Sequence, residues 1–491
     1  MLFNSQPFLL LFLPVVLAGF FLLGRRSPAA AAWWLAAASL FFYGYWNPRF
    51  LPLLLASVVL NYRLGVLLRS RPSRRWLAAG VAANLLALGW FKYAGFLAAS
   101  AHLPVPDIVL PVGISFFTFT QIAFLVDTCE GKAREGRFAH YLLFVTYFPH
   151  LVAGPVLHHK EMMPQFAKPA IYRPRALDFA VGVTIFVAGL AKKVLIADNL
   201  APYANAVFNH CGGPSLLLAW GGVLAYAFQL YFDFSGYSDM AIGLSRLFGV
   251  RLPLNFASPY KAATISDFWR CWHMTLSRFL RDYLYVPLGG NRHGKTRRYA
   301  NLMVTMLLGG LWHGAGWNFV IWGGLHGIYL AIHHAWTALR LPLGQRAATA
   351  LTFIGVCYAW VFFRAPDLHA ALAYVAGMSG ANGVALPDAF GSRFGGLLPL
   401  MERWGITFYG GGGSQFIDTW SAVAAAAAIV FLCPNTQQIM ARFAPALDCR
   451  TQRASRLAWA PTRAWGAAIG VIALLDLLSL NRPSDFLYFQ F

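Results

Sequence analysis

The chain has 491 residues, of which 58% are hydrophobic and 12% are charged, and its net charge at pH 7 is +21. Soluble domains carry about 25% charged residues, so this composition excludes a soluble globular protein and indicates an all-α polytopic membrane protein. The positive charge fits cytoplasmic loops that face anionic lipid. Since the sequence contains no basic-aromatic nucleic-acid module, we expect membrane lipid, and no nucleic acid, as its surroundings.

Long apolar windows run along the whole chain. A spanning helix needs roughly 20 apolar residues, which predicts about 11 to 13 membrane helices. The windows are 7–24, 29–46, 50–68, 76–97, 108–126, 139–153, 177–197, 215–232, 299–336 (two elements), 349–363, 418–433 and 463–480. Segment 379–417 holds the glycine run 410–413, which is typical of a flexible loop.

Basic residues alternate between the loops of the first half. Arg25 and Arg26 follow the first window, whereas only Arg49 follows the second. Four arginines lie in 69–75, none in 101–107, and three basic residues lie in 127–137. By the positive-inside rule, this alternation predicts an N-terminus outside the cytoplasm.

The stretch 266–283 predicts an amphipathic helix at the inner membrane surface. Ser266 is a candidate N-cap, and Asp267 lies in the first turn. Apolar residues recur at helical spacing on one face. The opposite face holds Arg270, Arg278 and Arg281.

An ionisable ring, His313, lies within the run 307–330, which contains no Lys, Arg, Asp or Glu. Ionisable residues at membrane depth usually face a cavity or a pathway, but a neutral imidazole can also be a satisfied core residue, and the residues alone leave both open. Glycines at 309, 310, 314 and 316 predict close approach of a backbone or a substrate. His326 lies 13 residues further on, too far along one helix for contact with His313.

Other polar groups give weaker signals. His273 fits an interfacial ring with ordinary hydrogen bonds. The histidines at 158 and 159 are adjacent, so their side chains point in different directions and fit a metal pair poorly. No cysteine has a CxxC neighbour. We therefore expect no metal site. Asp233 and Asp239 either tie down a helix break near Gly236 or serve a proton-coupled transporter.

Seven stretches, spread over nearly the whole chain, resemble the membrane-bound O-acyltransferase (MBOAT) family in its bacterial alginate O-acetyltransferase branch. They are LPVGISFFTFTQIAFLVDTCEG at 110–131, FPHLVAGPV at 148–156, QLYFDFSGYSDMAIGLSRLFG at 229–249, the stretch 252–292, LLGGLWHGAGWNFVIWGGLHG at 307–327, WVFFRA at 360–365 and FLYFQF at 486–491. The resemblance implies one domain over 1–491, with core motifs at about 108–336 and tilted helices around a central tunnel.

The resemblance also implies the catalytic groups. It makes His313 the catalytic histidine and His273 a second functional position. We expect His313 to act as general base and His273 to position the thioester or stabilise the oxyanion. An acyl-histidine intermediate stays open.

The implied donor is acetyl-CoA, with no permanently bound cofactor. Candidate substrate-binding residues are Trp312, Trp272, Asn255, Arg270, Arg278, Arg281 and Asp282. A basic rim there would attract phosphates, or is ordinary positive-inside charge.

The implied location is the bacterial inner membrane, and the implied acceptor is an exopolysaccharide, with alginate preferred. The resemblance further implies an extracytoplasmic partner protein with a Ser-His-Asp site. The alternatives are D-alanyl or other acyl transfer to a cell-wall polymer, and a transporter that uses the same tunnel.

Overall fold

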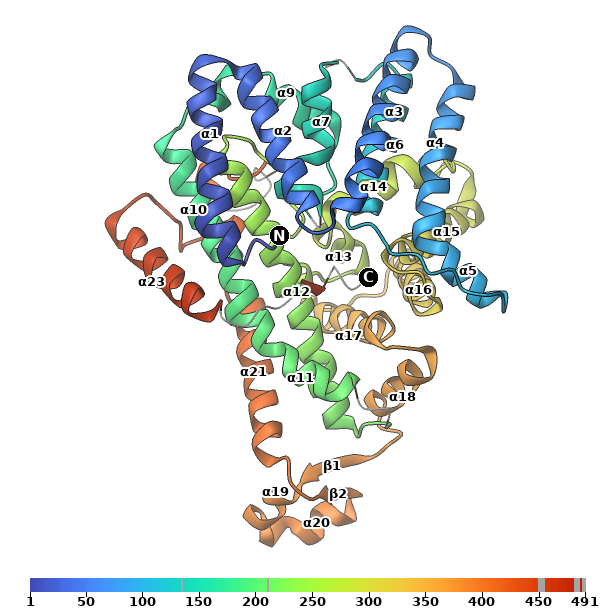
Figure 1. The fold of residues 1–491 in the computed structure, drawn as a ribbon. Coiled ribbons are helices and arrows are strands. Elements are labelled where there is room, and N and C mark those ends of the chain that lie inside the picture. Colours follow the sequence, from blue (N-terminus) through green and yellow to red (C-terminus); the bar gives the residue numbers. More distant parts are fainter. Residues whose placement is uncertain (134–135, 153, 210–211, 449–454, 481–485, 488–491) are drawn as a thin grey trace.

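The structure is a computed structural model that describes residues 1–133, 136–152, 154–209, 212–448, 455–480 and 486–487. The described residues form an all-α multi-pass membrane protein with one small two-stranded sheet (Figure 1). Every apolar window of the sequence contains helix, although residues 108–113 of the window 108–126 form a loop, and the window 299–336 forms two helices, as predicted.

The first half contains η1 (Phe8–Phe12), α1 (Leu13–Arg26), α2 (Pro28–Gly44), η2 (Pro48–Phe50), α3 (Leu51–Ser70), α4 (Arg74–Leu88), η3 (Gly89–Tyr93), α5 (Ala94–Ser100), α6 (Ile114–Cys129), α7 (Phe138–Thr146), α8 (Phe148–Leu151), α9 (His159–Phe166), η4 (Pro169–Tyr172), α10 (Ala176–Ala191), η5 (Lys192–Ala197), α11 (Asp198–Phe208) and α12 (Leu216–Leu247). The second half contains η6 (Pro259–Lys261), α13 (Ile265–Cys271), α14 (Met274–Leu280), η7 (Arg281–Tyr285), α15 (Gly294–His313), α16 (Trp317–Leu339), α17 (Gln345–Arg364), α18 (Leu368–Met378), β1 (Val384–Pro387), α19 (Asp388–Arg393), η8 (Gly395–Leu397), α20 (Leu398–Arg403), β2 (Ile406–Tyr409), α21 (Gly413–Leu432), α22 (Thr436–Met440), η9 (Ala441–Phe443) and α23 (Arg463–Ser479).

Seven helical stretches are long and apolar enough to cross a membrane. They are Phe8–Arg26, Pro48–Ser70, Arg74–Ser100, Ala176–Phe208, Leu216–Leu247, Gln345–Arg364 and Gly413–Phe443. The turns from α1 to α2 and from α3 to α4 lie at the same end of the molecule (Figure 1). The arginines of the first and third loops lie in these turns or in the last or first residues of the helices that they join. This arrangement agrees with the alternation of basic loops in the sequence.

Helix α12 runs through the centre of the fold and is buried over most of its length (Figure 1). The predicted helix break near Gly236 is wrong, since α12 is continuous there. A Cβ on Gly236 would lie 2.7 Å from the carbonyl oxygen of Gly189 in α10, so this glycine allows two helices to pack closely. The neighbouring carboxylates of Asp233 and Asp239 bind lysines of η5, and Asp233 also accepts from the backbone amide of Leu487, far along the chain, so neither ties down a break in α12.

Segment 379–417 contains regular structure where the sequence predicts a flexible loop. Strands β1 and β2 pair in parallel, with Val384 opposite Ile406, and α19 and α20 lie beside them. The backbone amide of Leu216 donates to the carbonyl of Gly383 at 3.0 Å, which ties the unit to the start of α12. The unit lies at the end opposite the arginine-bearing connections (Figure 1).

Helices α15 and α16 form a tightly packed hairpin. A Cβ on Gly310 would lie 2.2 Å from the carbonyl oxygen of Phe319, and one on Gly323 would lie 2.2 Å from that of Met306. Real Cβ atoms do not come this close, so both positions need glycine. The close approach predicted from the glycines of this stretch is therefore present at Gly310.

Replacing Gly323 with alanine is expected to lower stability by about 1–3 kcal/mol, because the added methyl group overpacks the hairpin. The matched control is Gly324→Ala, whose Cβ would be 3.5 Å from Leu307 Cδ2, an ordinary contact. Thermal unfolding in detergent checks both variants. Equal melting temperatures for the two would show that the hairpin has room to relax.

Candidate active site

His273, one of the predicted site residues, lies at a break between two short helices. Helix α13 ends at Cys271, and His273 has φ 42° and ψ 51° before α14 begins. A non-glycine residue in this left-handed region is uncommon. The prediction of one amphipathic helix over 266–283 is therefore wrong, because the left-handed residue ends the helical hydrogen bonding. The N-cap is Thr264, not Ser266: its side chain accepts from the amide of Asp267.

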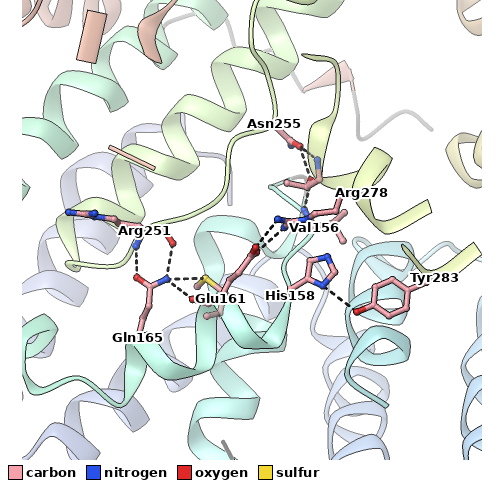
Figure 2. A network of polar contacts seen from close by, with 10 residues as sticks. Val156, His158, Glu161, Gln165, Arg251, Asn255, Arg278 and Tyr283 are labelled. Atoms are coloured by element: carbon pink, nitrogen blue, oxygen red, sulfur yellow. Dashed lines mark hydrogen bonds and ion pairs between the residues drawn. The ribbon is translucent and has the colours of Figure 1, made fainter. Parts of the chain in front are cut away.

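The His273 ring is fully buried and held by a chain of hydrogen bonds. Its Nδ1 lies 3.2 Å from Asn255 Oδ1, and Thr275 Oγ1 donates to the same oxygen at 2.7 Å. The amide of Val156 donates to Thr275 Oγ1 at 2.9 Å (Figure 2). Since an amide oxygen only accepts, Nδ1 of His273 carries the proton, and Nε2 presents a lone pair. Nothing in the sequence pattern points to Thr275.

The structure brings His313 next to His273. His313 is the last residue of α15, and the centroids of the two rings are 6.2 Å apart. Aromatic side chains surround His313, with ring centroids at 4.9 Å for Trp312, 5.1 Å for Trp322 and 5.3 Å for Phe363. Two imidazoles from separate elements thus lie in one buried, aromatic environment, where electrostatic contacts are strong.

A third histidine, His326, belongs to the same aromatic cluster. The chain reverses after His313, so α16 brings His326 back beside α15. The Trp322 ring lies 5.1 Å from the His313 ring and 4.8 Å from the His326 ring. Spacing along one helix could not predict this arrangement, and Trp322 carried no signal in the sequence beyond its place in an apolar run.

A cavity of about 190 Å³ adjoins His313. Its lining residues are Trp46, Lys92, Leu110, Pro111, Val112, Gly113, Ile114, Ser115, Phe116, Val152, Trp312 and His313. Several of these come from loops that the charge pattern places outside the cytoplasm. The cavity is large enough to admit a small polar group to the His313 ring.

Arg278 points into the protein rather than onto a basic rim. Its Nη1 and Nη2 donate to Glu161 Oε1 and Oε2 at 2.7 and 2.9 Å (Figure 2). Beside this pair, Tyr283 donates to Asp127 Oδ2 at 2.9 Å and contacts His158 Nδ1 at 3.2 Å. Burial and the nearby Arg278 lower the pKa of His158 to about 3, so the ring is neutral. Glu161 had not been predicted from the sequence.

The comparisons with known proteins can now be set beside this geometry. The model of MBOAT, the membrane-bound O-acyltransferase family, matches residues 106–367. The chain belongs to the MBOAT family. It is 45% identical over 427 residues to the peptidoglycan O-acetyltransferase of Helicobacter pylori, which covers 79% of this chain and 81% of the relative.

Two further relatives mark the range of similarity. The probable alginate O-acetylase AlgI of Azotobacter vinelandii is 43% identical over 412 residues, covering 79% of this chain and 80% of the relative. The teichoic acid D-alanyltransferase of Streptococcus thermophilus is 30% identical over 246 residues, covering 48% of this chain and 59% of the relative. Family membership and the names of these relatives make this chain an O-acyltransferase.

The remaining predicted binding residues of the MBOAT chain do not lie at the two histidines. Arg270 pairs with Asp267 at 2.9 Å, and Arg281 pairs with Asp282 at 2.8 Å, all on exposed or half-exposed side chains. Trp272 is buried, and its ring centroid lies 5.0 Å from that of Trp360. The arginines and Asp282 are therefore surface groups, whereas Trp272 packs the core behind the site.

Replacing Thr275 with valine is expected to slow acyl transfer by this MBOAT enzyme about 10- to 100-fold. The change keeps the shape of the side chain but removes the hydroxyl that binds Asn255 Oδ1 beside His273. A misplacement of a positioned group by about 1 Å can cost about 100-fold in rate. Initial rates of acyl transfer check this result. Thr275→Ser keeps the hydroxyl and should stay near the wild-type rate; a serine variant as slow as the valine variant would argue against the hydrogen-bond chain.

Proposed function

We propose that this MBOAT enzyme takes an acetyl group from acetyl-CoA on the cytoplasmic side of the inner membrane and transfers it to a hydroxyl acceptor on the outer side. The observation that carries the proposal is the pairing of His313 with His273, whose ring centroids are 6.2 Å apart, beside a cavity lined by outward loops. The acyltransferase class follows from the family; the donor, the direction and the residue roles are the proposal.

In the proposed reaction, His313 accepts the proton of the acceptor hydroxyl. The hydroxyl oxygen then bonds to the thioester carbonyl carbon, and the carbon–sulfur bond breaks. The proton leaves with the coenzyme A thiolate as the free thiol. A neutral imidazole in a water-poor site suits this step, because its ordinary pKa lies near the working pH.

The hydrogen bonds of His273 favour one of its two expected roles. With Nδ1–H directed to Asn255, the neutral ring offers only a lone pair at Nε2. A lone pair can accept a hydrogen bond and so orient a donor, but it does not stabilise an oxyanion. We therefore assign His273 a positioning role in which Nε2 accepts from a substrate group that carries a hydrogen, since the thioester carbonyl itself can only accept.

The two faces of the molecule suit different substrates. The exposed Arg270 and Arg281 lie on the segment expected at the inner surface and can attract the phosphates of acetyl-CoA. The cavity at His313 is lined by the loop at 110–113, which the charge pattern places outside. A tunnel between these two faces would let the thioester reach His313 from within.

For the acceptor we propose an extracytoplasmic polysaccharide, with alginate first. The support is the 43% identity to the probable alginate O-acetylases. The 45% identity to a peptidoglycan O-acetyltransferase supports peptidoglycan as the second candidate. D-alanyl transfer has weaker support, since the match to the teichoic acid enzyme covers 48% of this chain. An outer partner protein with a Ser-His-Asp site would receive the acetyl group and pass it on.

An acetyl-transfer assay in vesicles tests the proposal. Purified protein is inserted in vesicles, and acetyl-labelled acetyl-CoA is supplied on the face that carries the basic loops. We expect release of free coenzyme A and label on an alginate oligosaccharide when the partner protein is present. Label on peptidoglycan fragments alone would select the second acceptor, and unchanged acetyl-CoA with the partner and both acceptors present would sink the proposal.

A further inference from the structure

A buried lysine from a distant helix reaches the residue at the centre of the proposed chemistry. Lys92 lies in η3, a π-helical turn within the spanning stretch Arg74–Ser100. Its Nζ lies 2.5 Å from the carbonyl oxygen of Trp312 and 3.3 Å from that of His313. The ammonium also lies 5.8 Å from the centroid of the Trp312 ring.

These contacts cap the C-terminal end of helix α15. The last carbonyls of an α-helix have no partner within the helix, and a cation there also complements the helix dipole. Tyr93, the next residue after Lys92, donates its hydroxyl to the carbonyl of Leu311 at 3.0 Å. Two adjacent side chains of η3 thus bind the carbonyls of residues 311, 312 and 313. π-helical turns of this kind occur often at functional sites.

Packing alone does not account for a lysine at this place. A charged amine in a membrane-spanning segment is costly, and none of the ion pairs formed by the described residues includes Lys92. Its third contact is Ser115 Oγ at 3.5 Å. Lys92 and Ser115 both line the cavity that His313 also lines, so the ammonium lies between the helix end and the space where the acceptor would enter.

We propose that Lys92 is a positioning residue of acyl transfer: it fixes the backbone at Trp312 and His313 and so holds the His313 ring toward the cavity. The proposal rests on the function proposed above. Removing the ammonium should free the end of α15 and misdirect the ring, while the donor would still bind on the other face. The turnover number should therefore fall while KM for the donor stays the same.

The test compares Lys92→Met, which keeps the length of the side chain, with Lys92→Arg, which restores a cation. We expect the turnover number to fall about 10- to 100-fold in the methionine variant, with the donor KM within about twofold of wild type, and to recover at least in part in the arginine variant. Tyr93→Phe is the control for loss of a single neutral hydrogen bond and should lose less. A raised donor KM with unchanged turnover, or wild-type turnover in Lys92→Met, would overturn the proposal.

A second measurement does not depend on the reaction. Amide hydrogen exchange of the peptide covering 307–317 should be faster in Lys92→Met than in wild type. In Lys92→Arg it should be slower than in Lys92→Met, and other peptides should be unchanged in both variants. Equal exchange in all three proteins would overturn the positioning role. If wild type does not cleave acetyl-CoA, the proposed function fails, and the exchange pattern still decides whether Lys92 holds the end of α15. Should the methionine variant not fold, Lys92→Gln replaces it in both measurements.

Discussion

Replacing His313 with glutamine is expected to reduce acetyl transfer by about 10²- to 10⁴-fold, the range that general-base catalysis contributes. Glutamine is close to histidine in size and polarity, so the buried site should stay filled, but its amide cannot take a proton from a hydroxyl. Release of free coenzyme A from labelled acetyl-CoA measures the effect. Folding is checked in parallel by thermal unfolding.

The aromatic cluster supplies a matched control in His326→Gln. His313 and His326 are both buried, and both contact the Trp322 ring. Only His313 lines the cavity. We expect the His326 variant to keep most of its rate; an equal loss in both variants would mean that packing of the cluster, rather than proton transfer, sets the rate, and would remove His313 from the role of base.

Replacing Lys193 with methionine is expected to destabilise the protein by about 3–5 kcal/mol, the usual cost of removing one partner of a buried ion pair. Lys193 Nζ lies 2.7 Å from Asp233 Oδ1 and 2.9 Å from Asp198 Oδ1. Both Lys193 and Asp233 are 2% exposed, so the carboxylate left behind would have little access to water. The melting temperature in detergent measures the loss.

The double variant Lys193→Met with Asp233→Asn separates charge from packing. Neutralising Asp233 removes the uncompensated charge, so the double variant should recover part of the loss. Asp198 is 20% exposed and can regain water. A double variant no more stable than Lys193→Met would show that the lysine stem, rather than the ion pair, supports this region.

The same ion pairs bear on the transporter alternative. Asp233 pairs with Lys193, and Asp239 accepts from Lys192 at 2.6 Å. Both carboxylates are therefore used by the packing of η5 against α12, which is a structural role, although not the predicted tie-down of a helix break, and it agrees with membership of an acyltransferase family.

Much of the fold could be predicted because hydrophobic length has a direct physical meaning in a bilayer. The windows became helices, and the glycines near His313 predicted a close helix contact that Gly310 makes. The predictions of the fold that failed concern places where local packing competes with the pattern of residue types in the sequence. Gly236 suggested a break, but the gain of close packing against Gly189 keeps α12 straight.

The candidate site, too, could be predicted only in part. An ionisable ring in an apolar run was visible at His313, and the family resemblance added His273. The support of these rings was not visible, because Thr275 and Lys92 contact their partners only after the chain folds, across separations in sequence that carry no period. Lys92 and Trp312, for instance, are 220 residues apart.

The left-handed backbone at His273 has a consequence for how this site could change over generations. The conformation is disfavoured for any residue with a Cβ by about 1–2 kcal/mol, so glycine would relieve strain at this position. A glycine there would regain this energy, but it would also remove a buried ring that is hydrogen-bonded to Asn255, and the cavity left behind costs about 2–5 kcal/mol. Backbone strain and side-chain packing therefore pull this position in opposite directions, so selection on folding already restrains residue 273, and selection on the proposed reaction would add to that restraint.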